Sequence, residues 1–347
     1  MEKREDTILI KAEELRQFCN RIMRNVIDEE SCKHVVDSMI QSNLRGVDTH
    51  GVVRIYPYAK RFSTIKWKKP EIELNHKATA LLNGNNSAGQ VCAAKAMEIA
   101  IDKAQEYGIG MVGVKNSNHF GTAAYYTMMA TEKDMIGFAF TNASPRIAPW
   151  GGKERLFGNN PWSYAFPTNK GYPVVFDISN SVVAAGKIRL AALKGEEIPE
   201  GWAMDKDGVP TQNPEDALKG LLNPIGNHKG YGITFVMDVL SGILTGSGFA
   251  KQINGIDDVN NTQNVGHLLG AINIKHFMGL DDFLTRIEEL INLVKTSKTA
   301  KGVNELFVPG EIEQRVYEER LENGIPLTHK VIDKLNELAD EFGESRL

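Results

Sequence analysis

One short segment of the chain places a hydroxyl, an imidazole and a guanidinium close together. Thr49, His50 and Arg54 fall within six positions, and Gly51 between them keeps the backbone open. His50 and Arg54 are four residues apart, so they share one face if the segment is helical. An imidazole titrates near working pH, and a guanidinium can bind a carboxylate through two parallel hydrogen bonds. The segment indicates chemistry on an alcohol that carries a carboxylate, with a capped helix start and a solvated arginine as the alternative.

A second polar segment lies where a predicted strand passes into a predicted helix. Residues 116–122 read Asn-Ser-Asn-His-Phe-Gly-Thr, with His119 at the centre. Backbone amides at a helix start can hold an anion, and strand-to-helix loops are the usual ligand position in α/β sheets. We therefore predict a ligand site with His119 at its rim, the alternative being an incidental loop histidine.

Three further segments combine glycine with polar side chains but are less specific. They are residues 151–161, which end in Gly-Asn-Asn-Pro, residues 177–187, which begin Asp-Ile-Ser-Asn-Ser, and residues 228–232, which read His-Lys-Gly-Tyr-Gly. The first can be a tight turn, because Gly and Asn readily adopt positive φ. The third resembles a phosphate grip but lacks the full P-loop spacing. None of the three identifies a function alone.

Residues 108–113 match the dinucleotide fingerprint Gly-x-Gly-x-x-Gly letter for letter. That motif binds a pyrophosphate only when its glycines follow a strand and open a helix. Here a predicted helix precedes the match, and residues 109–114 have the pattern of a strand. We predict no phosphate site at this match, so a dinucleotide would bind without the usual Rossmann signature.

The bulk composition is that of an ordinary globular protein of 347 residues, with 42% hydrophobic and 24% charged residues. The net charge of −4 gives no attraction to nucleic acid or anionic membrane, and we expect neither as a partner. The three cysteines and eight histidines are scattered, so neither a disulfide framework nor a metal site is expected. Without an apolar N-terminal stretch, the predicted location is cytoplasmic.

The periodicity of apolar residues predicts an α/β fold with a mixed sheet. Helices are expected near both ends, over residues 15–26, 35–44, 311–322 and 330–342, the last capped by Thr328. Between them we expect strands at 79–82, 109–114, 136–141, 162–166, 174–178 and 268–274. Helices are expected at 93–106, 122–132 and 233–244, and a further helix should begin at a cap formed by Asp281 or Asp282. Between the strand at 174–178 and about Gly230 we expect an irregular stretch. The predicted domains are a helical one, 1–75 plus 303–347, and a mixed α/β core, 76–302, that binds cofactor and substrate.

Five segments, taken in order, resemble the malate/L-lactate dehydrogenase family of the second type. They are residues 48–54 (Asp-Thr-His-Gly-Val-Val-Arg), 117–121 (Ser-Asn-His-Phe-Gly), 158–161 (Gly-Asn-Asn-Pro), 229–232 (Lys-Gly-Tyr-Gly) and 309–311 (Pro-Gly-Glu). The resemblance covers about residues 10–330. The family also includes ureidoglycolate, sulfolactate and diketogulonate dehydrogenases and an imino-acid reductase.

This resemblance implies a non-Rossmann cofactor domain, an intertwined homodimer, and NAD as cofactor with NADP as the alternative. The implied reaction moves a hydride between nicotinamide and a small 2-hydroxy or 2-keto acid of the malate or L-lactate type. Two alternatives remain: oxidation of ureidoglycolate, suggested by residues 202–210 and 238–242, and an inactive ligand-binding protein on the same fold.

Carried over residue by residue, the resemblance assigns three groups of site residues. The chain departs from the family pattern at Thr49, where serine is usual, at Asn159, where many members have threonine, and at Lys187, where the imino-acid reductase branch has a relay aspartate. We prefer His50 to His119 for proton transfer, because it lies nearer to Arg54. The assigned residues are Thr49, His50, His119 and Lys187 (catalytic), Arg54, Tyr58 and Asn159 (substrate), and His119, Phe120, Gly121, Thr122, Ala123, Asp177, Ile178, Ser179, Lys229, Pro309, Gly310 and Glu311 (cofactor).

Overall fold

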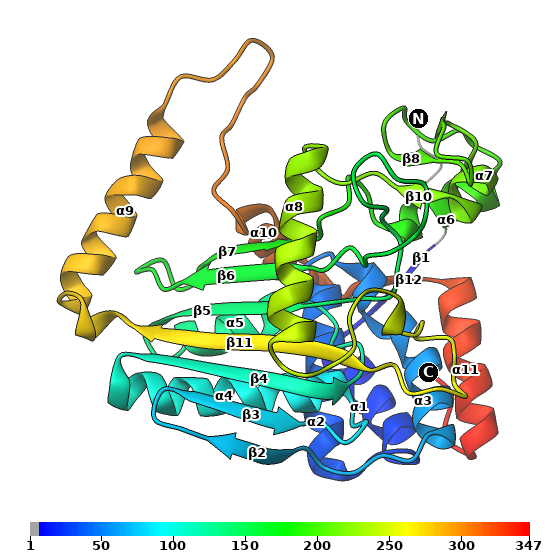
Figure 1. Cartoon of the computed structure of the whole chain (residues 1–347), viewed down its shortest axis with the longest axis horizontal. Coiled ribbons are helices and arrows are strands. Elements are labelled where there is room, and N and C mark those ends of the chain that lie inside the picture. Colours follow the sequence, from blue (N-terminus) through cyan, green and yellow to red (C-terminus); the bar gives the residue numbers. More distant parts are fainter. Residues whose placement is uncertain (1–6) are drawn as a thin grey trace.

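The centre of the molecule is a seven-stranded mixed sheet (Figure 1). The structure is a computed structural model and describes residues 7–347. Strands β3 and β4 run parallel, and the other neighbouring strands run antiparallel. The expected mixed α/β class is therefore confirmed. In spatial order the strands are β2 (Glu71–Asn75), β3 (Thr79–Asn83), β4 (Ile109–Ser117), β11 (Val265–Asn273), β5 (Met135–Thr141), β6 (Trp162–Phe166) and β7 (Val174–Ile178).

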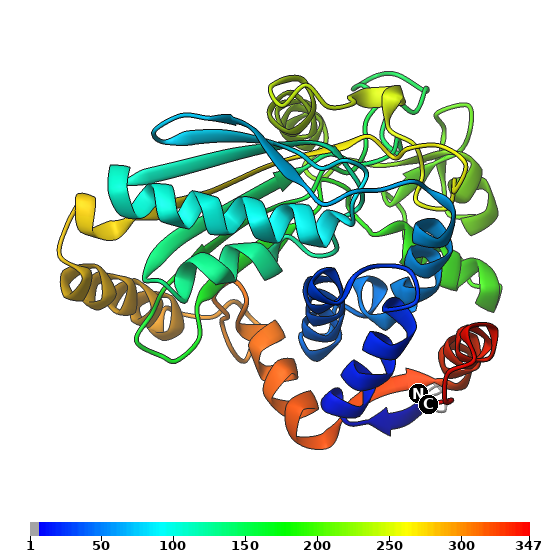
Figure 2. The same cartoon turned by 90° about the horizontal axis from the view of Figure 1, so that it is seen from below.

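Two helices, α4 (Gly89–Tyr107) and α5 (Ala124–Thr131), cover one face of the sheet (Figure 2). Alanines line the buried side of α4 and let the helix approach the sheet closely. A Cβ atom on Gly110 of β4 would lie 2.0 Å from the carbonyl oxygen of Ala100. Gly108 ends α4 in the left-handed conformation, with φ of 83°. The apparent fingerprint thus ends a helix and forms a strand, as predicted, and its first two glycines serve capping and packing.

The opposite face of the sheet carries α8 (His228–Asp238), which continues into a π-helical turn, Val239–Ile243 (Figure 1). Helix α9 (Leu280–Thr296) follows β11 and extends beyond the edge of the sheet. Gly279 occupies the N-cap of α9, and Asp281 and Asp282 lie inside its first turn. The expected cap at either aspartate is therefore wrong, although acidic residues still favour the positive end of the helix there.

Helices from both ends of the chain form one layer beside the sheet (Figure 2). They share a hydrophobic cluster that includes Leu15, Ile40 and Leu338, and β1 (Thr7–Ile10) pairs antiparallel with β12 (Ile325–Thr328). Helices from both termini therefore pack together as expected, and we propose that they form the helical domain. We propose that its boundary lies before β2 rather than near residue 75, because β2 pairs with β3 of the sheet. The helices are α1 (Ala12–Met23), α2 (Glu29–Leu44), α3 (Ile55–Thr64), α10 (Glu311–Asn323) and α11 (His329–Phe342).

The stretch expected to be irregular up to Gly230 contains regular structure, so that expectation is wrong. Helices α6 (Ala185–Lys194) and α7 (Pro214–Lys219) pack on a small sheet, in the order β10 (Leu221–Leu222), β8 (Ala203–Met204) and β9 (Pro210–Thr211). The elements of this unit other than α6 are between two and six residues long, too short to show a period in the sequence. No helix within residues 7–347 is long and apolar enough to cross a membrane.

Candidate active site

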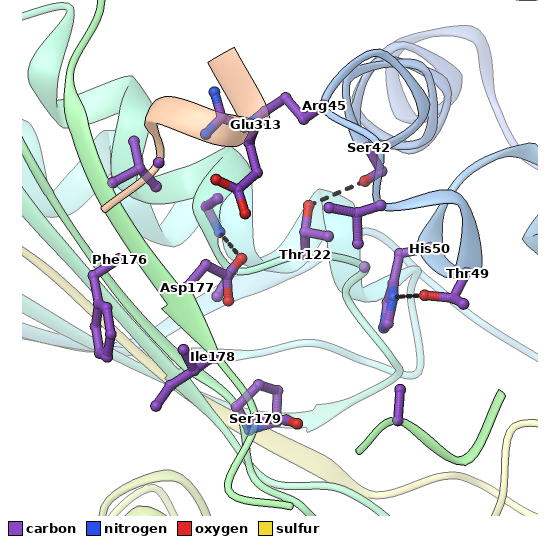
Figure 3. Close-up of a pocket in the computed structure, with 18 of the residues that line it drawn as sticks. Ser42, Arg45, Thr49, His50, Thr122, Phe176, Asp177, Ile178, Ser179 and Glu313 are labelled. Carbon is purple, nitrogen blue, oxygen red and sulfur yellow. Dashed lines mark hydrogen bonds between the residues drawn. The ribbon is translucent and has the colours of Figure 1, made fainter. Parts of the chain in front are cut away.

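Two adjoining cavities share part of their walls, and we call them cavity A and cavity B. Cavity A lies between the end of α2, the start of α5, β7 and the start of α10. Cavity B lies between the turns at residues 49–54, the loops after β4 and β5, the start of α6 and residues 255–265. Figure 3 shows cavity A, with side chains from β7, α2 and α10 around it. The predicted residues in its wall are Thr49, His50, Gly121, Thr122, Ala123, Asn159, Asp177, Ile178, Ser179, Pro309 and Gly310. Those in the wall of cavity B are Thr49, His50, Arg54, His119, Phe120, Gly121 and Asn159.

The two cavities share part of their walls. Thr49, His50, Gly121 and Asn159 contribute to both. Molecules bound in the two cavities would therefore meet beside His50. This shared wall comes from segments around residues 50, 120, 160 and 184, and the sequence alone does not show that these segments meet.

Two consecutive 3-10 turns, Asp48–His50 and Val52–Arg54, position the first segment. The side chain of Asn43 on α2 holds them: its oxygen accepts the amide of Val52 at 2.8 Å, and its nitrogen donates to Asp48 at 2.6 Å. A Cβ atom on Gly51 would lie 2.1 Å from the Asn43 oxygen, so this contact requires glycine. His50 and Arg54 are brought together by this packing rather than by a single α-helix.

Hydrogen bonds orient the three chemically useful side chains of this segment. The hydroxyl of Thr49 lies 3.0 Å from Nδ1 of His50, as Figure 3 shows. Nε of Arg54 donates to the carbonyl oxygen of Thr49 at 2.7 Å. This bond fixes the plane of the guanidinium, and its two Nη groups have no hydrogen-bond partner within residues 7–347. Arg54 therefore presents a free two-pronged donor to cavity B.

His119 is held by a separate set of hydrogen bonds. Its Nδ1 accepts the backbone N–H of Gly121 at 3.3 Å and lies 2.7 Å from the hydroxyl of Tyr58. Its own backbone N–H donates to Gln263 at 2.8 Å. An Nδ1 that accepts leaves the proton on Nε2, so neutral His119 is a hydrogen-bond donor at its other edge. The rings of His119 and His50 stack with centroids 5.5 Å apart.

Both histidines are neutral at neutral pH. Burial lowers the pKa of His50 from 6.5 to about 4, and the charge of Arg54 acts in the same direction. Burial also holds the pKa of His119 well below its ordinary value, with further repulsion from His50 and Arg54. The unprotonated form, which can accept a proton, therefore prevails for both rings at neutral pH, and for His50 it prevails down to about pH 5.

Cavity A contains a carboxylate at the start of α5. Asp177 on β7 accepts the backbone N–H of Ala124 at 2.8 Å (Figure 3). Burial raises the pKa of the Asp177 carboxyl from 3.8 to about 6, opposed by this hydrogen bond and by Arg45. Two residues before Asp177 on β7, the amide of Val175 donates to the carbonyl oxygen of Pro309 at 3.1 Å, which holds Pro309 and Gly310 against this strand.

Four of the predicted site residues lie outside the walls of both cavities. Tyr58 is buried behind His119, where it can position that ring. Lys187 is exposed on α6. Lys229 lies in a separate apolar groove at the start of α8, beside Trp162 and Tyr164. Glu311 pairs with Lys295 at 2.7 Å and Arg315 at 2.8 Å.

Cavity B also contains charged residues that the sequence did not single out. They are Arg146, Arg189 and Asp257. Arg146 follows β5 by a few residues, at the end of a strand, where ligand-binding loops are common. Its position just after a predicted strand was the one feature of the sequence that could have indicated Arg146. Arg189 lay in the stretch expected to be irregular, and nothing in the sequence indicated it. Within residues 7–347 no group of three or more metal-ligating side chains is found.

The chain is similar to known dehydrogenases over nearly its whole length. The model of a family described as malate/L-lactate dehydrogenase matches residues 10–336. The malate dehydrogenase of Pyrococcus abyssi is 41% identical over 98% of this chain and 96% of its own length. The ureidoglycolate dehydrogenase (NAD(+)) of Escherichia coli K12 is 33% identical over 88% of this chain and 89% of its own length. The structure of sulfolactate dehydrogenase from Methanocaldococcus jannaschii superimposes with a TM-score of 0.91 at 36% identity, covering 97% of this chain and 98% of that one.

These matches extend over nearly the whole chain, and the names of the matched proteins agree on dehydrogenases of hydroxy acids. The chain therefore belongs to the malate/L-lactate dehydrogenase family and is an oxidoreductase that acts on the CH–OH group of hydroxy acids.

Proposed function

We propose that the protein transfers a hydride between a nicotinamide cofactor, bound in cavity A, and C2 of a small 2-hydroxy or 2-keto acid, bound in cavity B. The shared wall at Thr49 and His50 carries this proposal, since it brings a proton-transfer group to the junction. Arg54, with two free Nη groups, stands on the substrate side of that junction.

The residues of cavity A suit a dinucleotide. A buried carboxylate, Asp177, can accept hydrogen bonds from ribose hydroxyls or a carboxamide, and Val175, Ile178 and Pro309 supply apolar contact for a flat ring. Gly121 to Ala123 and Pro309 with Gly310 would hold the cofactor, which when bound supplies the hydride acceptor. The proposed cofactor is NAD, with NADP as the alternative. The relative from E. coli that carries NAD(+) in its name supports this choice.

The side chains of cavity B would orient the acid and move its proton. Arg54 binds the carboxylate with its two Nη groups, which fixes C2 toward cavity A. His50 accepts the hydroxyl proton as the alcohol is oxidised, and Thr49 holds its Nδ1 edge. His119 donates from Nε2 to oxygen on the substrate, which stabilises the charge that develops there.

A substrate panel tests the proposal. We expect the purified protein to oxidise NADH or NADPH, followed by absorbance, with oxaloacetate, pyruvate or a close relative. Ureidoglycolate in the forward direction tests the alternative that the E. coli relative favours. Should none of these compounds give turnover above background, the proposal is wrong and an inactive ligand-binding protein is the better reading.

Replacement of Asp177 by asparagine is expected to stabilise the cofactor-free protein. The folded pKa of Asp177, about 6, lies above its ordinary value of 3.8, so wild type loses stability as pH rises through about 4 to 6. An amide does not ionise, and it keeps an oxygen for the Ala124 amide. The gain in the free energy of unfolding should reach about 1–2 kcal/mol at about pH 8 and vanish below about pH 4. It is smaller than the free energy that corresponds to the whole pKa shift, because the side chain is partly exposed to solvent.

Urea unfolding at the two pH values measures this gain, and fluorescence titration measures NADH affinity. The same variant should bind NADH less tightly, because a neutral amide is a weaker acceptor than a carboxylate. Unchanged stability at about pH 8 would contradict the cost of charge burial. Unchanged NADH affinity would remove Asp177 from the cofactor site.

We also propose that the working form is a homodimer. In support, α8 and the turn after it expose apolar side chains on the outer side of the sheet: Phe235 (49%), Val236 (49%), Ile243 (55%) and Leu244 (62%). Contiguous exposed apolar residues of this kind favour an interface. The cytoplasmic location and the cofactor contacts of Lys229 and Glu311 stay predictions.

A further inference from the structure

Cavity B has a strong excess of positive charge. Its wall contains three guanidinium groups, on Arg54, Arg146 and Arg189, and a single carboxylate among the described residues, on Asp257. The two histidines in the same wall are neutral at neutral pH because burial lowers the pKa of each. The cavity therefore carries two more positive than negative charges, whereas one carboxylate on a substrate would balance only one of them.

Arg146 and Arg189 both lack a hydrogen-bond or ion-pair partner among the described residues, and Arg146 is the more buried of the two. It is partly buried, yet its guanidinium makes no hydrogen bond to another residue within 7–347, and no ion pair of it is found there. Burial, then repulsion from Arg155 and Arg189, lowers the pKa of Arg146, and the smaller effect of the Asp257 charge opposes them. A partly buried cation without partners is costly to keep, unless a ligand supplies the missing acceptors.

Two other arginines of this chain have their guanidinium donors satisfied inside the protein. Arg155 donates to the carbonyl oxygens of Gly220 at 2.6 Å and Leu218 at 2.7 Å. Arg61, which is fully buried, donates to Asn118 at 2.6 Å and to two backbone carbonyls. Their donors are used to fix loops. The donors of Arg146 are unused inside the protein, which distinguishes it from both.

The backbone around Arg146 is rigid, so its side chain starts from a fixed point. Its amide donates to the carbonyl oxygen of Phe157 at 2.7 Å, and its own carbonyl accepts the amide of Leu222 at 3.0 Å. The next residue, Ile147, is fully buried. Arg189 projects from α6 into the same wall and is more exposed. Preorganised donors of this kind suit recognition of a small anion.

We infer that Arg146, assisted by Arg189, forms a second anion subsite in cavity B, which binds a negative group at the far end of the substrate. The inference rests on the proposed function, in which Arg54 binds the C1 carboxylate. It selects 2-hydroxy acids with a second carboxylate or a sulfonate over those that end in a methyl group. Both distal groups present oxygens that a guanidinium can bind through parallel hydrogen bonds.

Steady-state kinetics with matched substrates test the subsite. The probes are malate and 3-sulfolactate as dianions and L-lactate as the monoanion, each with the cofactor that gives turnover. We expect wild type to show a kcat/KM for a dianion at least about 100-fold above that for lactate. Arg146→Gln should lower kcat/KM for both dianions about 10- to 100-fold and change that for lactate less than about threefold. Adding Arg189→Gln should remove most of the remaining preference.

Two further variants make the result specific. Arg146→Lys keeps the charge but loses the planar donor pair, so it should retain part of the dianion preference. Lys194→Gln removes one positive charge from the exposed end of α6, the helix of Arg189, and should leave the preference unchanged. If Lys194→Gln lost as much of the dianion preference as Arg146→Gln, the preference would come from the overall positive charge, and the subsite at Arg146 would be wrong. Melting temperatures show whether a variant has failed to fold, in which case Arg146→Lys carries the test.

Failure of this inference differs from failure of the proposed function. The subsite is wrong, while the dehydrogenase activity stands, if the wild-type kcat/KM for lactate equals that for the dianions. The same holds if Arg146→Gln lowers kcat/KM for lactate as much as for the dianions. If Arg146→Gln lowers kcat/KM for only one of the two dianions, the subsite recognises the shape of that distal group rather than its charge. That result would overturn the proposed substrate class, which includes both carboxylates and sulfonates. If no acid is turned over, calorimetric titration of malate and lactate into wild type and Arg146→Gln decides, because the subsite requires tighter malate binding that the substitution weakens.

Discussion

His50→Ala is expected to lower kcat for oxidation of the 2-hydroxy acid by at least about 100-fold, the smallest effect usual for loss of a general base. His50 stands in the shared wall of the two cavities, and its Nδ1 is held by Thr49. The base must reach the C2 oxygen, whose carbon bears the carboxylate that Arg54 would bind. His50 lines both cavities, whereas His119 lines cavity B alone. Steady-state kcat at saturating cofactor measures the effect.

The pH dependence provides an independent measure of the same role. The pKa of His50 in the free enzyme is about 4, and only its neutral form accepts a proton. In wild type, protonation of His50 should not change kcat/KM for oxidation between about pH 8 and about pH 5.5, and below about pH 5.5 it should lower kcat/KM. His50→Ala should lack this limb.

Acid also acts on stability, and the control must separate the two effects. The folded pKa of His50 lies below its ordinary value of 6.5, so its contribution to stability is complete above about pH 6.5 and is lost as pH falls through about 4. Enzyme kept at the acid pH and assayed near pH 7.5 should therefore recover its full activity. Activity that does not return would mark unfolding rather than titration of the base.

His119→Ala is the matched comparison, because the two rings stack and share burial and charge repulsion. We expect it to raise KM more than it changes the pH profile, since its Nδ1 is occupied by Tyr58 and Gly121 and its Nε2 serves as a donor. If His119→Ala removes the acid limb and His50→Ala keeps it, the assignment is reversed.

The second large effect is expected at Arg54. Arg54→Lys should lower kcat/KM for the 2-hydroxy acid by about 10- to 100-fold, which corresponds to about 1–3 kcal/mol of lost transition-state stabilisation. The charge remains, but the planar pair of Nη donors is lost, and with it the bond from Nε to Thr49 that sets its plane. The dissociation constant of NADH should hardly change, because Arg54 lines cavity B and not cavity A.

Arg155→Lys is the matched control for Arg54. Arg155 also donates from Nε and Nη, but to backbone carbonyls outside both cavities. Its replacement should leave kcat/KM within about threefold of wild type, the scatter expected for a residue remote from the chemistry. Normal kcat/KM in Arg54→Lys would remove Arg54 from the substrate site.

Local pattern in the sequence was sufficient for the fold class and for two segments that line the cavities, around His50 and His119. The apolar periods of residues 79–141 predicted strands and helices in the correct order, because facing the core imposes a period of 2 or 3.6 on any sequence. The order of helix and strand around Gly108 was enough to reject the dinucleotide fingerprint. Thr49, His50 and Arg54 were found together because a single tight loop holds all three. The short elements between residues 185 and 222 were missed because two to six residues cannot display a period.

Only the tertiary structure decided which distant residues converge. Tyr58 and His119 are 61 positions apart, yet they share a hydrogen bond, and β11 lies between β4 and β5 although it follows both in the chain. Arg146 and Arg189 enter the wall of cavity B because α6 packs against the loop after β5, whereas Lys229 and Glu311 lie outside both cavity walls. A sequence period records which face of an element is buried, but it does not record the neighbour against which that face packs. Long-range packing therefore fixed the charge of cavity B, which the motifs alone left open.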